Sequence, residues 1–498
     1  MTPQPMDDAL KALAASLLAA APASVEMPAG TGKTHLLAAA VATAADDSKR
    51  SLVLTHTNAG VDAIRKRLRS FGVPSGMARV ETITSWAFSL VRAYPHLAGI
   101  VVAETPDWAL SDQYVEGAAR VAAATAIAEV HATSFDYVFV DEYQDCTLVH
   151  HAFITAIADA VPRTVLLGDR LQAIFGFTGA LAEWDAHVLP SFPAFAVEPI
   201  PQRWRGHNEA LGTWLLQVRS HLVDGLDFDF TEHSVPHLTL VTDTSPTSVA
   251  AVAHAFRDFG ETVLLLDGAA WRVAGHASRL NGSYAVMEDI NGRFMRDQIN
   301  GNCSSPQHPV LPLPAPGEPG LARWFAQFAK ACVIGLGDLN NPVLQRLERN
   351  QSLTGLSRDG IQPVVNALEQ LRSTATYEQL AAAAREVRAI SQVKVYRWEA
   401  WADTLAAIAL SAENGEPAID NFGRVRERLR RQGRKSHARI ASRTLLVKGL
   451  EYDHVVIADL SQFRDPRHLY VALSRARKSV TVIGGSMRIR LQNDRPRA

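Results

Sequence analysis

Short apolar runs alternate with helical periodicities along the first third of the chain. Residues 51–55, 137–140 and 164–167 are short and mostly apolar, and the last two each end at a carboxylate. Residues 33–45 and 58–69 instead carry apolar side chains at the spacing of one helix face. Buried strands separated by helices predict a parallel, doubly wound sheet. Functional residues of such a sheet lie at the carboxyl ends of the strands.

A second set of apolar runs appears later and predicts a second sheet. These runs are residues 238–241, 262–266, 455–458 and 480–483. About 150 residues interrupt this set, beginning with a proline-rich stretch over 305–320. The helical patterns inside the interruption cover residues 321–336, 363–372 and 377–390. The expected fold class is therefore α/β, with two parallel sheets and a mainly helical insertion.

Composition gives the chain ordinary globular properties. Of its 498 residues, 47% are apolar and 20% are charged, so sizeable cores are expected. The formal net charge is −1, so a polyanionic partner would have to be met by local basic patches. Cys146, Cys303 and Cys332 are widely spaced and form no CxxC pair. This spacing argues against a disulfide framework or a structural zinc site and favours the reducing cytoplasm.

The N-terminal region imitates a secretory signal without matching it. Residues 9–23 are apolar and end in small residues, but Asp7 and Asp8 stand where a basic segment would be required. We expect an amphipathic first helix there. No apolar run is long enough to predict a membrane span.

The most informative stretch is Met-Pro-Ala-Gly-Thr-Gly-Lys-Thr at residues 27–34. Gly30 and Gly32 allow backbone N–H groups to converge on a phosphate, and the following helix adds its positive dipole end. Lys33 can reach the β- and γ-phosphates, and the Thr34 hydroxyl suits Mg²⁺. Met27 replaces the glycine of the strict pattern. We predict a phosphate cradle formed by Pro28, Ala29, Gly30, Thr31, Gly32, Lys33 and Thr34.

Two carboxylates follow the strand predicted at residues 137–140. Asp141 can hold Mg²⁺, directly or through water, and Glu142 can accept a proton from an attacking water. Nucleoside triphosphate hydrolysis requires this division of labour. A nucleoside triphosphate and Mg²⁺ are therefore expected at this site.

Seven blocks in order resemble the UvrD/Rep-like superfamily 1 DNA helicases. They are residues 28–34, 54–65, 140–145, 168–180, 201–205, 447–452 and 469–477. Asp-Glu-Tyr-Gln-Asp (141–145) and Gly-Asp-x-x-Gln-Ala-Ile-Phe (168–175) are the most specific of them. The resemblance implies an ATP-driven translocase on single-stranded DNA, of 3′-to-5′ polarity, with two RecA-like motor domains and mainly helical insertions.

The resemblance also implies a division into domains. The first RecA-like domain would cover residues 1–195, with a small insertion at about 88–132. The second would consist of residues 196–290 and 426–498, separated by the helical insertion at 291–425.

Site roles come from the resemblance residue by residue. Gln172 resembles the γ-phosphate sensor, and Arg205 and Arg475 resemble the arginines that reach the γ-phosphate. Trp204 stands where the family has a tyrosine that stacks on the nucleotide base, and Glu451 matches a residue near the ribose. Lys33, Glu142, Gln172, Arg205 and Arg475 are thus the expected catalytic set.

The expected DNA contacts also follow from the resemblance, and all of them except Thr84 and Trp86 lie in the matching blocks. They are His56, Thr57, Asn58, Thr84, Trp86, Phe175 and Phe177. His56 replaces the usual phenylalanine, Leu445 a usual histidine and Thr178 a usual arginine. The adenine-reading glutamine of the family has no convincing counterpart, which leaves the preference for ATP open.

Two functions remain open at this point. One is a helicase acting on single-stranded or 3′-tailed DNA. The other is a DNA-end-sensing nucleotidase with little unwinding, since the compact chain resembles helicase-like subunits of antiviral defence systems such as Gabija, which act beside a separate nuclease. No membrane partner is expected.

Overall fold

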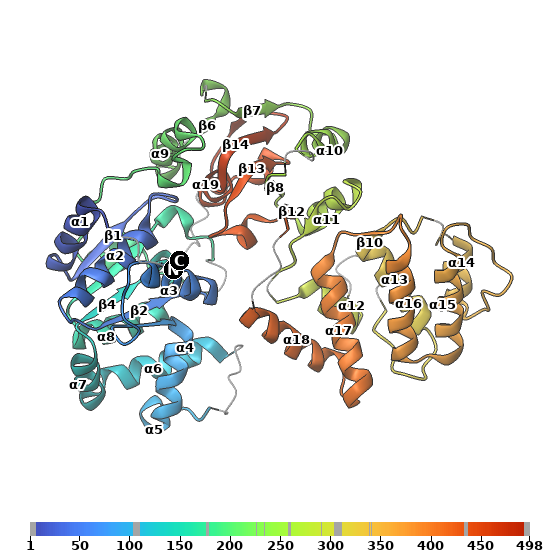
Figure 1. Cartoon of the computed structure of the whole chain (residues 1–498), viewed down its shortest axis with the longest axis horizontal. Coiled ribbons are helices and arrows are strands. Elements are labelled where there is room, and N and C mark those ends of the chain that lie inside the picture. The colour runs from blue at the N-terminus through green and yellow to red at the C-terminus, as the bar shows by residue number, and fades with distance from the viewer. Residues whose placement is uncertain are drawn as a thin grey trace. The chain divides into compact units, whose positions relative to one another are not determined.

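The computed structural model describes residues 6–102, 110–175, 179–225, 227–233, 235–256, 260–289, 291–302, 311–337, 339, 341–432 and 437–492 (Figure 1). Contacts divide the chain into two compact units. The first unit comprises residues 1–228, 464–477 and 490–498, and the second comprises residues 229–463 and 478–489. The domain boundaries expected from the sequence stay a prediction.

The first unit is built on a parallel sheet. Its strands are β1 (Ala23–Glu26), β2 (Ser51–Thr55), β3 (Ala78–Thr82), β4 (Tyr137–Val140) and β5 (Thr164–Gly168). They lie in the order β1-β5-β4-β2-β3, and every neighbouring pair is parallel. The predicted strands β2, β4 and β5 are confirmed, whereas β1 and β3 were not predicted.

Both faces of this sheet are covered by helices. On β2, Leu52 and Leu54 belong to one buried cluster, whereas Val53 between them belongs to another. The first cluster includes residues of α4 (Ile83–Ala93), α6 (Ser111–Ala123) and α8 (Leu148–Ala160). The second includes residues of α1 (Asp8–Ala19), α2 (Lys33–Asp46) and α3 (Asn58–Ser70). Because successive strand residues point to opposite faces, this division confirms the doubly wound architecture.

Additional helices complete the first unit. Helices α5 (Pro95–Ala98) and α7 (Thr125–Ser134) lie beside α4 and α6 in the region of the small predicted insertion (Figure 1). Helices α9 (Glu209–Val223) and α19 (Pro466–Ser474) pack against each other although they are far apart in sequence.

The first helix is shorter than expected. The sequence pattern predicted a helix over residues 9–23, but α1 ends at Ala19 and β1 begins at Ala23. Pro22 lacks a backbone N–H and disfavours helical backbone at the preceding residue, so the helix cannot continue through it. Asp7 caps α1 by accepting a hydrogen bond from the Leu10 N–H at 2.7 Å.

The second unit contains the second predicted sheet. Its strands are β7 (Leu238–Val241), β8 (Val263–Leu266), β9 (Ala285–Val286), β12 (Arg439–Ser442), β13 (Tyr452–Ile457) and β14 (Ala476–Ile483). Their order is β7-β14-β13-β8-β12-β9, and β7/β14, β8/β13, β8/β12 and β9/β12 are parallel pairs. Helices α10 (Pro246–His254) and α11 (Ala270–Arg279) share a buried cluster with one face. Two RecA-like sheets are thus present, as predicted. Short strands β6 (Phe228–Asp229) and β15 (Arg488–Ile489) form a separate pair.

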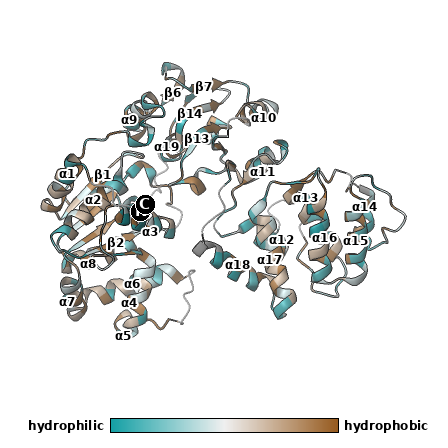
Figure 2. Ribbon diagram, in the orientation of Figure 1, coloured by the Kyte–Doolittle hydropathy of each residue, from teal (hydrophilic) through white to brown (hydrophobic). Residues whose placement is uncertain are grey.

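A helical bundle interrupts this second sheet. It consists of α12 (Arg293–Asn300), α13 (Leu321–Cys332), α14 (Asn341–Glu348), α15 (Gln362–Thr374), α16 (Tyr377–Ala389), α17 (Trp398–Asn414) and α18 (Ala418–Gln432). The predicted helix 321–336 stops at Cys332 because Val333 and Ile334 form β10, which pairs with β11 (Lys394–Val395). Figure 2 shows α18 as largely hydrophilic, in contrast to the buried α13.

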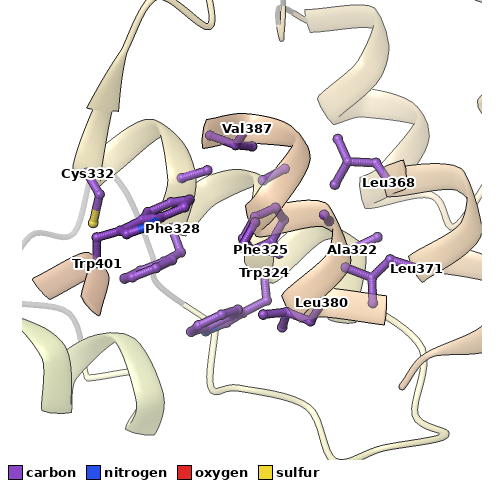
Figure 3. Packing of buried hydrophobic residues seen from close by; sticks show 14 of the residues in the cluster. Ala322, Trp324, Phe325, Phe328, Cys332, Leu368, Leu371, Leu380, Val387 and Trp401 are labelled. Carbon is purple, nitrogen blue, oxygen red and sulfur yellow. The ribbon is translucent and has the colours of Figure 1, made fainter. Parts of the chain in front are cut away.

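Helix α13 forms the centre of the bundle. Trp324 stacks on Phe328 at a centroid distance of 5.2 Å, and Phe328 stacks on Trp401 of α17 at 5.8 Å (Figure 3). The Trp324 indole N–H donates to the Gln298 carbonyl at 2.8 Å. A helix that is apolar on most sides is stable only when neighbours surround it, so α13 organises the packing of the others.

Within the described part of the chain, none of the helices combines the length and the apolarity that crossing a membrane would require.

We expect Trp324→Ala to destabilise the helical bundle by about 3–5 kcal/mol, since it removes a buried aromatic ring and leaves a cavity. Trp271→Ala is the matched control, because that side chain is 78% exposed and its loss should change stability by less than about 0.5 kcal/mol. Thermal unfolding with limited proteolysis would compare them. Equal effects of the two substitutions would contradict the role given to α13.

Candidate nucleotide site

The predicted phosphate loop connects β1 to α2. Gly30 and Gly32 have φ angles of 74° and 97°, in the region that favours glycine. Gly32 provides no side-chain cap for α2, so the loop and the first helical turn expose backbone donors toward the same end of the helix. The Met27 side chain is buried in the core cluster shared with α1 and α2. Methionine at this first position therefore anchors the loop in the core.

The two predicted carboxylates lie beside Lys33. The Lys33 ammonium is 2.9 Å from Glu142 Oε1 and 4.0 Å from Asp141 Oδ1. The Thr34 hydroxyl donates to Asp141 Oδ2 at 3.2 Å. Residues separated by more than 100 positions thus meet at the carboxyl ends of β1 and β4, as the doubly wound fold predicts.

Burial and charge set the ionisation of this cluster. Burial raises the pKa of Asp141 to about 6, against the opposing effect of Lys33. Burial alone would lower the pKa of Lys33, but the carboxylates of Glu142 and Asp141 raise it above its ordinary value. The ammonium therefore stays charged, and it neutralises the acids around it.

Glu142 has an unusual backbone conformation. Its φ angle is 56° and its ψ angle is 38°, in the left-handed region, which costs a non-glycine residue energy. The Gln144 amide N–H donates to Glu142 Oε2 at 2.5 Å, and Gln144 Oε1 accepts from the Asp169 backbone N–H at 2.9 Å. The carboxylate of Glu142 is thus held by Lys33 on one oxygen and Gln144 on the other.

Gln172 and Arg475 meet at the same site. Gln172 donates from Nε2 to Asp169 Oδ2 at 3.1 Å, and its Oε1 accepts from Arg475 Nη2 at 3.3 Å. The Arg475 side chain is only 1% exposed and also donates to the Val471 carbonyl at 3.0 Å. Arg475 and α19 belong to the same compact unit as the phosphate loop.

Trp204 is buried against the phosphate loop. Its indole N–H donates to the Ala476 carbonyl at 2.7 Å, and the side chain is 1% exposed. A Cβ atom on Gly30 would lie 2.8 Å from this ring. Stacking on a nucleotide base would require the ring to move, and that role stays a prediction.

The predicted arginine and ribose contacts have different surroundings. Arg205 is exposed, whereas its neighbour Arg203 donates from its backbone N–H to the Gly30 carbonyl at 2.9 Å and from its side chain to the Ser474 carbonyl. Glu451 is an exposed residue before β13 in the second unit. The roles of Arg205 and Glu451 stay predictions.

Two residues that support the loop were not predicted. The Tyr470 hydroxyl accepts a hydrogen bond from the Ala29 backbone N–H at 2.9 Å. Arg219 of α9 pairs with Glu26 at 2.5 Å and with Asp169 at 2.9 Å. Tyr470 lies in a quoted sequence block, so that block could have drawn attention to it. Arg219 lies in an ordinary helix, and no sequence signal singles it out.

The residues predicted to contact DNA differ in solvent exposure. His56 Nε2 is 3.4 Å from Cys146 Sγ, Thr57 caps α3 by accepting from the Gly60 N–H at 3.0 Å, and Asn58 is exposed in the first turn. Thr84 is half-buried, and Trp86 is buried in the core beneath Arg79.

Phe175 is half-buried, and Phe177 lies outside the described residues. The contact of each predicted residue with DNA stays a prediction.

The oxygen donors fit Mg²⁺ better than a softer metal. Thr34 offers a hydroxyl and Asp141 a carboxylate, which are ligand types that Mg²⁺ prefers, and bound phosphates commonly complete its shell. Among the described residues, no group of three or more His, Cys, Asp or Glu side chains is placed to hold a metal by itself. Thr34 and Asp141 would hold the ion together with a nucleotide.

Two family models match the chain in the regions that form this site. An AAA domain model matches residues 10–178, and a UvrD-like helicase C-terminal domain model matches residues 446–483. Together with the geometry, they support a superfamily 1 helicase with a nucleoside triphosphate-hydrolysing motor. Their combined coverage is below half of the chain.

Among solved structures, the chain is similar to the Pif1 helicase from Candida albicans, with 12% identity, a TM-score of 0.39 and coverage of 96% of this chain and 95% of that chain. No curated protein matches the sequence.

We expect Gly30→Ala to weaken nucleotide binding and to destabilise the first unit. The left-handed backbone costs alanine about 1–2 kcal/mol, and the new methyl group would clash with Trp204. Gly206→Ala is the matched control, because Gly206 also has a positive φ of 72° but has nothing within 4 Å of an added Cβ. Calorimetric binding and thermal unfolding should show the larger loss for Gly30→Ala. Equal losses would mean that Trp204 does not pack on the loop.

Proposed function

We propose that the chain is an ATP-dependent DNA helicase of the UvrD/Rep type that translocates on single-stranded DNA from 3′ to 5′. The observation that carries this proposal is the convergence of Lys33, Glu142, Gln172 and Arg475 beside the loop at residues 28–34. Each of these side chains has a distinct task in phosphoryl transfer to water.

The ion pair of Lys33 with Glu142 provides the starting arrangement. A bound triphosphate offers Lys33 a denser set of anionic oxygens than one carboxylate does, so the ammonium would shift toward the phosphates. Glu142 then becomes available to accept a proton from the attacking water, while Gln144 keeps its second oxygen in place. Bound Mg²⁺, held through Thr34 and Asp141, would neutralise phosphate charge.

Arg475 and Gln172 would respond to the terminal phosphate. Arg475 carries a permanent positive charge, is buried and is oriented by the Val471 carbonyl, so it can stabilise charge on the transferred phosphoryl group. Gln172 connects this arginine to Asp169. Loss of the terminal phosphate on hydrolysis would change these contacts and shift α19. We propose that this shift couples hydrolysis to movement of the motor.

The cellular setting follows from the same features. Cys146 and Cys332 are buried free thiols, and we propose that the protein works in the cytoplasm. Its partner would be single-stranded or 3′-tailed DNA.

We expect Lys33→Ala to lower ATP hydrolysis by at least about 10²-fold, because it removes the charge that neutralises the phosphates and orients Glu142. Steady-state phosphate release with single-stranded DNA measures this effect. Lys11→Ala, an exposed change in α1, is the control and should retain activity. Undiminished hydrolysis by Lys33→Ala would refute the site.

We expect strand displacement on a duplex with a 3′ single-stranded tail and none on a blunt duplex, since the motor must load on one strand before it moves. A fluorescence unwinding assay with 3′-tailed, 5′-tailed and blunt substrates measures the polarity. Unwinding of only the 5′-tailed substrate would contradict the proposed direction.

The alternative function predicts a different result in the same assay. A nucleotidase that senses DNA ends, working beside a nuclease in antiviral defence, would hydrolyse ATP with each DNA but displace no strand. That outcome would refute the helicase proposal and leave the hydrolytic site intact.

A further inference from the structure

A second concave site lies at the other edge of the first sheet. It is a cavity of about 620 Å³ whose lining includes Ser51 and Ala78, the first residues of β2 and β3. The phosphate loop follows the carboxyl end of β1. Because the strands are parallel, their amino ends meet at the edge opposite to the phosphate loop. The cavity is therefore distinct from the nucleotide site described above.

The cavity is strongly basic. Its lining includes Arg50, Arg65, Arg69 and Arg79, and no Asp or Glu among the described residues lines it. We call this cavity the arginine pocket. Guanidinium groups that lie close together repel one another. A bound anion lowers this repulsion, so a concave surface with several arginines attracts anions.

Most of this charge has no carboxylate partner. Within the described residues, neither Arg50 nor Arg69 forms an ion pair. Arg65 donates to the Val80 carbonyl at 2.6 Å, which is a neutral acceptor. Arg79 is 3.6 Å from Glu81 in an exposed pair that contributes little. Guanidinium groups in this state suit the bidentate recognition of phosphate.

Another acid next to the lining, Asp136, is already paired. Asp136 accepts a hydrogen bond from the Arg50 backbone N–H at 2.9 Å and pairs with Lys49 at 3.2 Å. Hydrogen bonds and the nearby Lys49 hold the pKa of Asp136 below its ordinary value despite partial burial. Its negative charge is thus directed to the backbone and to Lys49.

The pocket also has an apolar part. Its lining also includes Leu68, Val73, Pro74, Met77 and Phe135. A volume of about 620 Å³ lies within the range of roughly 300–1,000 Å³ typical of small-molecule sites. A ligand that combines phosphates with a flat apolar ring would satisfy both parts at once.

We propose that the arginine pocket binds a nucleoside phosphate, with its phosphates on the guanidinium groups and its base against the apolar wall. This second nucleotide site does not depend on the proposed helicase activity. Helix α3 connects the two edges of the sheet, because Asn58 begins it and Arg69 lies in its last turn. A ligand at the pocket would therefore act on the helix whose first turn carries predicted DNA contacts.

The test uses ADP without divalent metal as the probe and the full chain with Lys33→Ala, which weakens the phosphate loop. In this background, Arg50→Glu with Arg69→Glu cancels the net charge of the pocket, because Arg65 and Arg79 remain. Lys66→Glu with Arg67→Glu is the matched control, since both residues are exposed, lie outside the lining and give the same change in net charge. Isothermal titration calorimetry measures the affinity of each protein for ADP.

We expect the Lys33→Ala protein to retain one ADP site. The double substitution in the pocket should weaken ADP binding at least about tenfold, and the control should change it less than about twofold. Absence of ADP binding in the Lys33→Ala protein, or equal affinities of both double variants, would overturn the proposal. Binding of a thymidine oligonucleotide is measured in parallel. Loss of oligonucleotide binding without loss of ADP binding would assign the pocket to a DNA strand and would also overturn it.

A second measurement tests the proposal without any substitution in the pocket, in case the pocket variant does not fold. Hydrogen exchange of the Lys33→Ala protein should show ADP-dependent protection of residues 68–80, which form much of the lining. No change in that segment at saturating ADP would contradict the proposal.

Discussion

The ion pair between buried Lys33 and partly exposed Glu142 is the interaction on which the site depends. An unpaired ammonium would be costly to bury, and two neighbouring carboxylates would repel each other without it. Lys33 is the first residue of α2, and Glu142 follows the end of β4. The ion pair between them therefore connects helix α2 to the carboxyl end of strand β4. The Lys33 ammonium that stabilises the folded loop is also the group that would bind the phosphates of a nucleotide.

Contacts other than the Lys33–Glu142 ion pair also hold the phosphate loop in place. Tyr470 accepts from the backbone of Ala29, Arg203 donates to the carbonyl of Gly30, and the ring of Trp204 packs against Gly30. Arg219 connects Glu26, directly before the loop, to Asp169 after β5. Each contact reaches the loop from a helix or turn far away in sequence. A change of nucleotide state at the loop would therefore be transmitted to α9 and α19 through direct contacts.

The two edges of the first sheet have different electrostatic character. At the carboxyl edge, positive and negative side chains alternate around Lys33 and compensate one another. At the amino edge, the arginines of the pocket face a cavity without lining acids. A net charge of −1 for the whole chain conceals this local contrast, because the field at a surface depends on where charges lie.

The sequence by itself determined the sheet class, most of the strands of the two large sheets and the chemistry of the phosphate loop. These features rest on local patterns: apolar runs of strand length, glycines at positive φ, and carboxylates that directly follow a strand. Strands β1, β3, β9 and β12 escaped prediction because they are short or carry charged residues, and only neighbouring strands specify them. Helix α1 was predicted too long because the apolar pattern continues through Pro22, whose ring ends the helix.

Only the tertiary structure decided which side chains support the site. Arg219 has no motif around it, and its pairing with Glu26 and Asp169 depends on how α9 packs. Trp204 stands where the resemblance implies a base-stacking residue, and packing buries it against Gly30. The arginine pocket combines Arg50 with residues of α3, β3 and the segment before β4, which a linear pattern does not connect. Local sequence specifies conformation and chemical type, whereas burial and partners depend on contacts between distant segments.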